Sequence, residues 1–144
     1  MNKKIKNATF VEYRGISFKS KLEERMYKHL VSKGITPKYE AETYILSEKI
    51  SPKVPFYNRT KVRGFHRIKG PISAITYTPD FTFDIDGMHV ILEVKGKEND
   101  VFPVKRNLFR KLIEQDPRKI VYFEVRTLKE LNTTLDIIYG KKFV

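Results

Sequence analysis

The stretch TPDFTFDIDGMHVILEVK, residues 78–95, predicts the centre of the fold. Its dipeptide Asp86-Gly87, flanked by alternating apolar residues, is the strongest short-range signal for a two-residue β-hairpin. In that register the apolar residues of the two arms meet on one face, in the pairs Ile85 with Met88, Phe83 with Val90, Phe81 with Leu92, and Pro79 with Val94. A shift of one residue would destroy this match. The pattern therefore predicts a hairpin with arms at residues 75–85 and 88–95.

The second face of this hairpin is predicted to be polar, and it places Asp80 directly opposite Glu93, with Lys95 beside them. Opposed residues have Cβ atoms about 4.5–5.5 Å apart, where two like charges destabilise a sheet. A bound divalent cation such as Mg²⁺, which takes carboxylate ligands, would offset that repulsion. The alternative is a solvated face, with a diagonal salt bridge from Lys95 to Asp80 and Glu93 in water.

Composition limits the classes of protein that remain. The 144 residues are 40% hydrophobic, which is enough for one domain with its own core, residues 1–144. The absence of cysteine excludes disulfides, thiolate zinc sites and cysteine nucleophiles, and favours a reducing cytoplasm. No apolar run is long enough to cross a bilayer, so no membrane partner is expected. Three scattered histidines lack metal-ligand spacing and are expected to be surface or structural residues, namely His29, His66 and His89.

The formal net charge of +12 and a pI near 9.8 favour a polyanionic partner. No acidic residue lies between Lys49 and Pro79, whereas the aromatic residues Phe56, Tyr57 and Phe65 do. This pattern predicts a basic insertion at residues 47–74 that grips DNA phosphates and stacks on exposed bases. The alternative is an ordinary solvated loop. The basic residues are Lys49, Lys53, Arg59, Lys61, Arg63, Arg67 and Lys69, of which Lys61, Arg63, Arg67 and Lys69 are the chosen DNA-binding candidates.

The remaining elements follow from periodicity, caps and turn residues. A second helix is predicted with a cap at Asn99 or Asp100 and an apolar stripe of Val101, Val104, Leu108 and Leu112. The last strand follows this helix and should lie parallel to a neighbour, which makes an α/β fold with a mixed sheet. The predicted strands are residues 9–13, 39–46 and 120–125, with a turn at 14–15, and the predicted helices are residues 20–33, 101–115 and 127–135.

Four basic side chains of the second helix lie off this predicted stripe. They are expected either to grip the DNA backbone or to form a plain solvated face. These residues are Lys105, Arg106, Arg110 and Lys111.

The hairpin residues resemble a known signature. Thr78-Pro79-Asp80-Phe81 followed by Glu93-Val94-Lys95 is similar to the motif of PD-(D/E)xK nucleases, and residues 18–23 resemble a segment of the phage endonuclease I family of Holliday-junction resolvases. Residues 75–77 and the helix after Gly96 resemble a group of phage and prophage resolvases. The likeness covers residues 15–113, although residues 49–71 have no counterpart in the endonuclease I group. It implies a restriction-endonuclease-like core (αβββαβ), with helices flanking the sheet and the basic insertion between the first two core strands.

The resemblance also implies an activity, namely metal-dependent hydrolysis of branched DNA. Asp80, Glu93 and the Val94 carbonyl would hold Mg²⁺, with Mn²⁺ as a substitute, and Lys95 would orient the attacking water. Glu23 would join them, in competition with a role in a capping box that begins at Ser20, and Glu24 is a weaker substitute.

The same resemblance implies a homodimer, because resolving a junction requires paired cuts on two strands. The segment 1–17 is a candidate for the dimer interface. The protein would act in the cytoplasm of a host cell if it is encoded by a phage. Two alternatives remain open: a monomeric nuclease for flaps, forks or duplex DNA, and a non-catalytic basic DNA-binding module.

Overall fold

The hairpin predicted at Asp86-Gly87 forms the centre of a four-stranded sheet. In the computed structural model, which describes residues 10–140, β8 (Phe81–Ile85) and β9 (Met88–Val94) are antiparallel, with Phe81 opposite Leu92. The turn residues Asp86 and Gly87 have φ angles of 48° and 77°, as a tight hairpin turn of this kind requires. The register is therefore confirmed. The first arm is shorter than predicted, because the chain leaves the sheet at residues 78–80 and β7 (Ile75–Tyr77) is a separate strand.

We expect Gly87→Ala to destabilise the protein by about 1 kcal/mol, because an L-residue with a side chain resists the left-handed conformation. An added Cβ at Gly87 would meet nothing within 4 Å, so the cost would arise from the backbone alone. Gly96→Ala is the matched control, since that site is equally open and has no positive φ. Urea unfolding of both variants measures the difference, and equal midpoints would contradict the prediction.

The order of the main sheet is β10, β9, β8, β3. Strand β10 (Ile120–Val125) is parallel to β9, and β3 (Lys38–Tyr39) is antiparallel to β8. The parallel pair is joined by a crossover through helix α2 (Phe102–Ile113). The predicted mixed α/β sheet, with its last strand parallel to a neighbour, is therefore confirmed.

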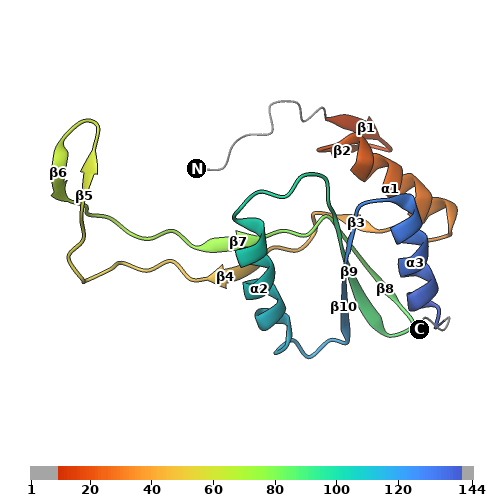
Figure 1. Ribbon diagram of the computed structural model, residues 1–144. Helices are drawn as coiled ribbons and strands as arrows, with labels where there is room; N and C mark the ends of the chain where they lie inside the picture. Colours follow the sequence, from red (N-terminus) through yellow and green to blue (C-terminus); the bar gives the residue numbers. More distant parts are fainter. Residues whose placement is uncertain (1–9, 141–144) are drawn as a thin grey trace.

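Helices cover both faces of this sheet (Figure 1). On one side α1 (Lys21–Ser32) and α3 (Leu128–Ile138) enclose a core that includes Leu30, Phe81 and Leu92. On the other side α2 packs over Ile91, which is fully buried. Thr82 on the same face is 2% exposed. The second hairpin face thus carries polar residues as predicted, but its middle is buried and not solvated, because α2 packs over Ile91.

The stripe predicted for α2 is wrong. Val104 is 60% exposed, whereas Phe102 and Phe109 are 9% and 0% exposed. The buried face is displaced because the ring of Phe109 packs edge-on against three tyrosines of the strands, with centroids 4.8–5.1 Å apart. Asn99 Oδ1 accepts hydrogen bonds from the Val101 and Phe102 amides at 3.1 and 2.9 Å, although the N-cap residue of the helix is Val101 and not Asn99 or Asp100. The other stripe residues, Val101 and Leu112, are exposed, and Leu108 is half-buried.

The first helix agrees with its prediction, and Ser20 is its N-cap. It is preceded by a small hairpin of β1 (Val11–Tyr13) and β2 (Ile16–Phe18), with the predicted turn at residues 14–15. The second of these strands was not predicted. Thr9, and with it residues 1–8 of the segment expected to contribute to a dimer interface, lies outside the described residues.

The strand predicted at residues 39–46 divides in two. Glu40 has a φ angle of 48°, which ends β3, and β4 (Tyr44–Ser47) pairs with β7 instead of the main sheet. Between β4 and β7 the chain runs away from the sheet and back, and it ends in a hairpin of β5 (Tyr57–Thr60) and β6 (Gly64–Arg67) (Figure 1). We call residues 49–74 the basic arm. Within residues 10–140, no helix has the length and apolar character needed to span a membrane.

Candidate functional site

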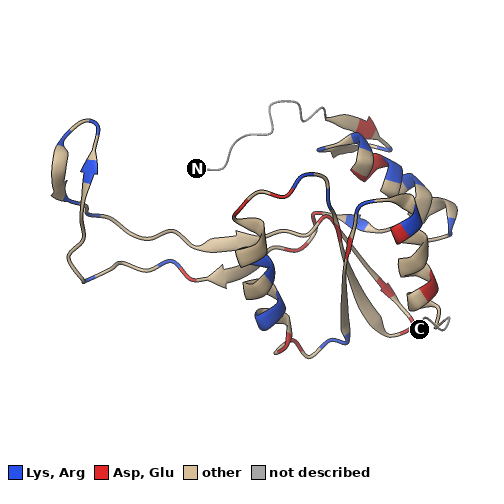
Figure 2. Cartoon of the chain, viewed as in Figure 1, with Lys and Arg blue, Asp and Glu red and all other residues tan. Residues whose placement is uncertain are grey.

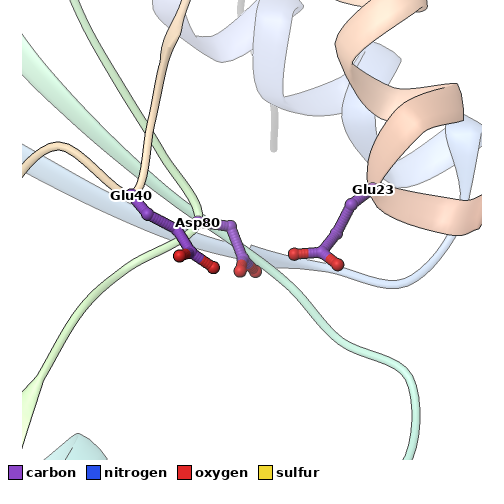
Figure 3. A group of neighbouring side chains, drawn as sticks. All are labelled: Glu23, Glu40 and Asp80. Carbon is purple, nitrogen blue, oxygen red and sulfur yellow. The ribbon is translucent and has the colours of Figure 1, made fainter. Parts of the chain in front are cut away.

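Three carboxylates from separate elements converge at one end of the main sheet. Glu23 comes from α1, Glu40 follows β3, and Asp80 precedes β8. One carboxylate oxygen of each lies within 4.8 Å of the others. Figure 3 shows Glu23 reaching from its helix towards Asp80 and Glu40. We call these residues the acidic cluster. The sequence predicted Glu23 and Asp80 as site residues and missed Glu40.

Asp80 connects the strands around this site. Its Oδ2 accepts a hydrogen bond from the Val94 amide at 2.7 Å, across the end of the hairpin. Its carbonyl oxygen accepts a 2.8 Å hydrogen bond from the Glu40 amide, which holds the turn after β3 next to β8. The break in the strand at residues 78–80 thus leaves Asp80 buried and fixed by both neighbours.

Only the serine half of the capping box that competes for Glu23 is present, because the Glu23 carboxylate bonds the Ser20 hydroxyl and not the Ser20 amide. The Ser20 hydroxyl accepts a hydrogen bond from the Glu23 amide at 3.1 Å and donates one to Glu23 Oε2 at 3.0 Å. The second oxygen, Oε1, accepts from the Tyr39 hydroxyl at 3.0 Å. Ser20 therefore caps the helix while the carboxylate of Glu23 still lies in the acidic cluster. Glu24 is outside the cluster and pairs with Lys28 at 3.0 Å.

Glu93 and Lys95 lie beside the acidic cluster and not in water. Glu93 Oε1 accepts a 2.8 Å hydrogen bond from the Tyr77 hydroxyl, and its Oε2 is 3.6 Å from Lys95 Nζ. The side chains of Glu93 and Lys95 are only 12% and 7% exposed, and the Lys95 ammonium lies over the ring of Phe102. The alternative of a solvated face is therefore wrong for this pair, because the aromatic residues of α2 and β7 cover it.

Burial and crowding shift the protonation of these groups. Burial, and then the charges of Glu93 and Glu23, raise the pKa of Asp80 well above its ordinary value. Burial also raises the pKa of Glu93 and lowers the pKa of Lys95. Negative charge is thus disfavoured at Asp80 and Glu93 unless a cation compensates it.

One further cation lies at the edge of the acidic cluster. Lys19 Nζ is 2.7 Å from Glu40 Oε1, an ion pair that lacks hydrogen-bond geometry. This carboxylate, followed by those of Asp80 and Glu23, raises the pKa of Lys19. Since the Lys19 side chain is 59% exposed, its charge is partly screened by solvent.

The raised pKa of Asp80 has a consequence for stability. When an acid is weaker in the folded state, ionisation favours the unfolded chain, so stability is lost as pH rises from about 4 through the folded-state pKa. Without divalent metal, Asp80→Asn should therefore have a higher Tm than wild type near neutral pH. The difference in Tm between the two proteins should disappear as the pH is lowered to about 4. Thermal unfolding in EDTA measures this. A pH-independent gap would show that Asp80 does not titrate as its burial requires.

The basic candidates are not gathered around the acidic cluster. Lys61, Arg63, Arg67 and Lys69 are exposed. They belong to the basic arm, which extends away from the sheet (Figure 2). On α2, Arg110 is exposed and Lys105 is half-buried.

Arg106, one of the predicted DNA-binding residues, is held in ion pairs with two carboxylates. Its Nε donates to Glu124 Oε2 at 2.7 Å, and its Nη2 also bonds Glu98. Arg106 follows Phe102 by one helical turn, and its side chain, which is 25% exposed, is directed towards Glu124 of β10. Its guanidinium ties the loop after Lys95 to the sheet and is not free to grip a phosphate.

His89 is a structural residue, which agrees with the expectation that the three histidines are surface or structural residues. It is 9% exposed, and its ring nitrogens lie 2.7 Å from Asp84 Oδ1 and 2.6 Å from Glu42 Oε2. A cavity of about 700 Å³, lined in part by these residues and Arg118, opens at the turn end of β8. Asp80 lies at the opposite end of the same strand, so this cavity is not part of the acidic cluster.

Glu40 was missed because of its backbone. The alternation of residues 39–46 predicts one strand, in which Glu40 is an ordinary side chain, and no motif marks its positive φ angle. The available signal was weak: an acidic residue in the strand predicted before the basic insertion. Only the pairing of β3 with β8, which places Tyr39 opposite Phe81, brings Glu40 next to Asp80.

Comparison with known proteins gives a family. No curated protein and no solved structure matches the chain. One family model, described as "Protein of unknown function (DUF1064)", matches residues 3–130. The match spans most of the 144 residues and includes the acidic cluster, the basic arm and Lys95. The chain therefore belongs to the DUF1064 family.

Proposed function

We propose that this protein is a Mg²⁺-dependent endonuclease that hydrolyses phosphodiester bonds in branched DNA. The observation that carries the proposal is the convergence of Glu23, Glu40 and Asp80 beside Glu93 and Lys95. Hard divalent cations take oxygen ligands and are commonly held by carboxylates together with substrate phosphates. The raised pKa of Asp80 supports the proposal, since a buried carboxylate among carboxylates needs a compensating cation.

The arrangement of elements also supports a nuclease. The signature residues Asp80, Glu93 and Lys95 resemble those of PD-(D/E)xK nucleases, and they lie at one end of a central hairpin. Helix α1 supplies Glu23, and a crossover through α2 leads to a parallel strand, β10. This order is the one expected for a restriction-endonuclease-like core, which we include in the proposal.

In this proposal the carboxylates of Glu23, Glu40 and Asp80 are metal ligands, and Glu93 and the Val94 carbonyl complete the set. The metal would activate a water molecule and stabilise charge on the attacking and leaving oxygens. Mn²⁺, which also accepts carboxylate and water ligands, would substitute.

The chain's own cation would act beside the metal ligands. The Lys95 ammonium is held between Glu93 and the ring of Phe102, so its position is set before substrate binds. A preorganised positive charge in a site that excludes water stabilises the negative charge that develops on a phosphate during attack. The Tyr77 hydroxyl keeps Glu93 oriented towards the same site.

DNA is the proposed substrate because of charge. The net charge of +12 favours a polyanion, and the basic arm extends the positive surface far from the acidic cluster (Figure 2). Branched DNA and action as a homodimer come from the resemblance to junction resolvases. A monomeric nuclease with the same site, acting on flaps, forks or linear duplex, is the alternative that substrate preference decides.

The test is cleavage of labelled four-way junction, flap, fork and linear duplex DNA, with Mg²⁺, with Mn²⁺ and with EDTA. Paired, metal-dependent cuts near the junction centre are the expected result. Preference for flaps or duplex would reject junction resolution but keep the nuclease. Binding without cleavage under every metal condition would reject the nuclease and leave a DNA-binding module.

A matched pair of variants tests the acidic cluster directly. Glu23→Gln should slow cleavage and raise the Mg²⁺ concentration needed for half-maximal rate, because it removes one charged ligand. Glu24→Gln, next to it on the same helix but paired with Lys28, should not. A metal titration of the cleavage rate measures both. Equal effects would show that Glu23 acts only through the helix terminus.

A further inference from the structure

The hairpin at the end of the basic arm has one face of unusual composition. Tyr57 is paired with Arg67, and Arg59 is paired with Phe65. Directly opposed residues, and residues two apart along a strand, share one face of a sheet. Two aromatic rings and two guanidinium groups therefore alternate on this face, and all four residues are exposed. We call it the aromatic face.

The rings of Tyr57 and Phe65 lie nearly parallel, with centroids 6.2 Å apart and an interplanar angle of 20°. They are 55% and 72% exposed, so no described part of the chain covers them. The hairpin stands away from the sheet and helices (Figure 1). Two large rings displayed in this way contribute little to a hydrophobic core, which indicates a role in binding.

The arm is paired at its base and near its tip. Beyond the hairpin, Ile68 N donates to the Phe56 carbonyl at 2.8 Å, and Ile50 and Ile72 exchange two backbone hydrogen bonds of 3.1 and 2.8 Å. These bonds hold the outgoing and returning segments of the arm together at its base and near its tip. The aromatic face is therefore displayed on a defined scaffold.

Charge identifies the kind of partner. No acidic residue lies between Lys49 and Pro79, and within residues 10–140 no carboxylate pairs with Arg59 or Arg67. Uncompensated guanidinium groups beside exposed rings are complementary to nucleotides, whose phosphates are anionic and whose bases have flat apolar faces. An apolar or acidic protein surface would match only half of this set.

We propose that the aromatic face binds unpaired nucleotides of the DNA substrate, with bases stacked on Tyr57 and Phe65 and phosphates held by Arg59 and Arg67. Within an intact duplex the faces of the bases are covered by their neighbours and only their edges are open in the grooves, so exposed rings have nothing to stack on. At a branch point bases lose their stacking partners. The inference deepens the proposed function, because it assigns the arm to the single-stranded part of the substrate.

The experiment measures binding without cleavage. Fluorescence anisotropy in EDTA compares a labelled oligothymidine strand with a duplex of equal length, for wild type and for the double variant Tyr57→Ala/Phe65→Ala. We expect the double variant to bind the single strand at least about tenfold more weakly, with little change for the duplex. Asn58→Ala is the matched control, because Asn58 lies on the opposite face of the same strand and should leave both affinities unchanged.

A second pair of variants separates stacking from charge. Arg59→Ala/Arg67→Ala should weaken binding to both forms of DNA. It should also reduce the dependence of binding on salt, because fewer phosphate contacts mean that fewer counterions are released when the protein binds. Equal losses for single strand and duplex in the aromatic variant, or no loss, would overturn the proposal. So would a change of the aromatic variant from dimer to monomer in light scattering, which would assign this face to a contact between two copies.

The outcome is distinguishable from that of the nuclease proposal. Single-strand binding that depends on the two rings, with no cleavage under any metal condition, would reject the nuclease and retain this inference. Metal-dependent cleavage with ring-independent binding would do the reverse.

Discussion

Asp80→Asn should lower the rate of metal-dependent cleavage on the order of 10³-fold while DNA binding persists. The substitution removes a charge and little else. The amide oxygen of the new side chain remains an acceptor for the Val94 amide, which bonds Asp80 Oδ2 at 2.7 Å in the wild type. The end of the hairpin should therefore keep its shape. What is lost is the carboxylate shared by the acidic cluster, so the variant cannot hold a divalent cation with the same charge.

Single-turnover cleavage with enzyme in excess separates this effect from binding. Asp84→Asn is a matched control on the same strand, since its side chain is 81% exposed and lies four residues away, at the turn end. It should cleave at the wild-type rate. Binding measured in EDTA should be equal or tighter for Asp80→Asn, because a negative charge near the phosphate is gone. Full activity of Asp80→Asn would sink the proposed site.

Lys95→Met should lower the cleavage rate by about 10²–10³-fold, the usual effect of removing one preorganised group that stabilises transition-state charge. Methionine keeps an unbranched apolar side chain of similar length but has no ammonium to lie over the Phe102 ring. The loss should therefore be chemical and not structural. Lys97→Met, two residues further and exposed, is the matched control and should be close to wild type.

The pH profile provides a readout that a structural role would not move. Burial lowers the pKa of Lys95, so its ammonium loses its proton at a lower pH than that of an ordinary lysine. If the charged form is the active one, the wild-type rate should fall on the alkaline side as Lys95 deprotonates. The residual rate of Lys95→Met should lack that fall. The same alkaline limb in both proteins would mean that Lys95 does not supply the charge.

Local patterns were sufficient for several elements. The register of β8 and β9 follows from alternation around Asp86-Gly87, because the turn and the apolar pairs demand the same alignment. Helix α1 follows from its four-residue spacing, with Ser20 at one end and Gly34 just beyond the other. The parallel position of β10 follows from a crossover rule that depends on connectivity alone. These features could be predicted because residues near in sequence determine them.

Other features depended on partners distant in sequence. The stripe of α2 was misplaced because Val104 and Phe102 are both apolar, and only tyrosines on three separate strands select the phenylalanine face. The sequence alone leaves Arg106 as a DNA-binding candidate, because its partners Glu98 and Glu124 lie outside the helix. The apolar pattern of a helix shows which of its faces are apolar. It carries no information about the surface against which the helix packs.

Residues close together in the chain were therefore enough to predict the hairpin, the α/β order of elements and the basic stretch free of acids. Folding was needed to bring Glu40 to Glu23 and Asp80, to bury the second face of the hairpin, and to leave Tyr57 and Phe65 exposed on the basic arm. The difference lies in the range of the interactions. Turns, caps and alternation act over a few residues, whereas burial and the meeting of charges depend on segments that only the folded chain brings together.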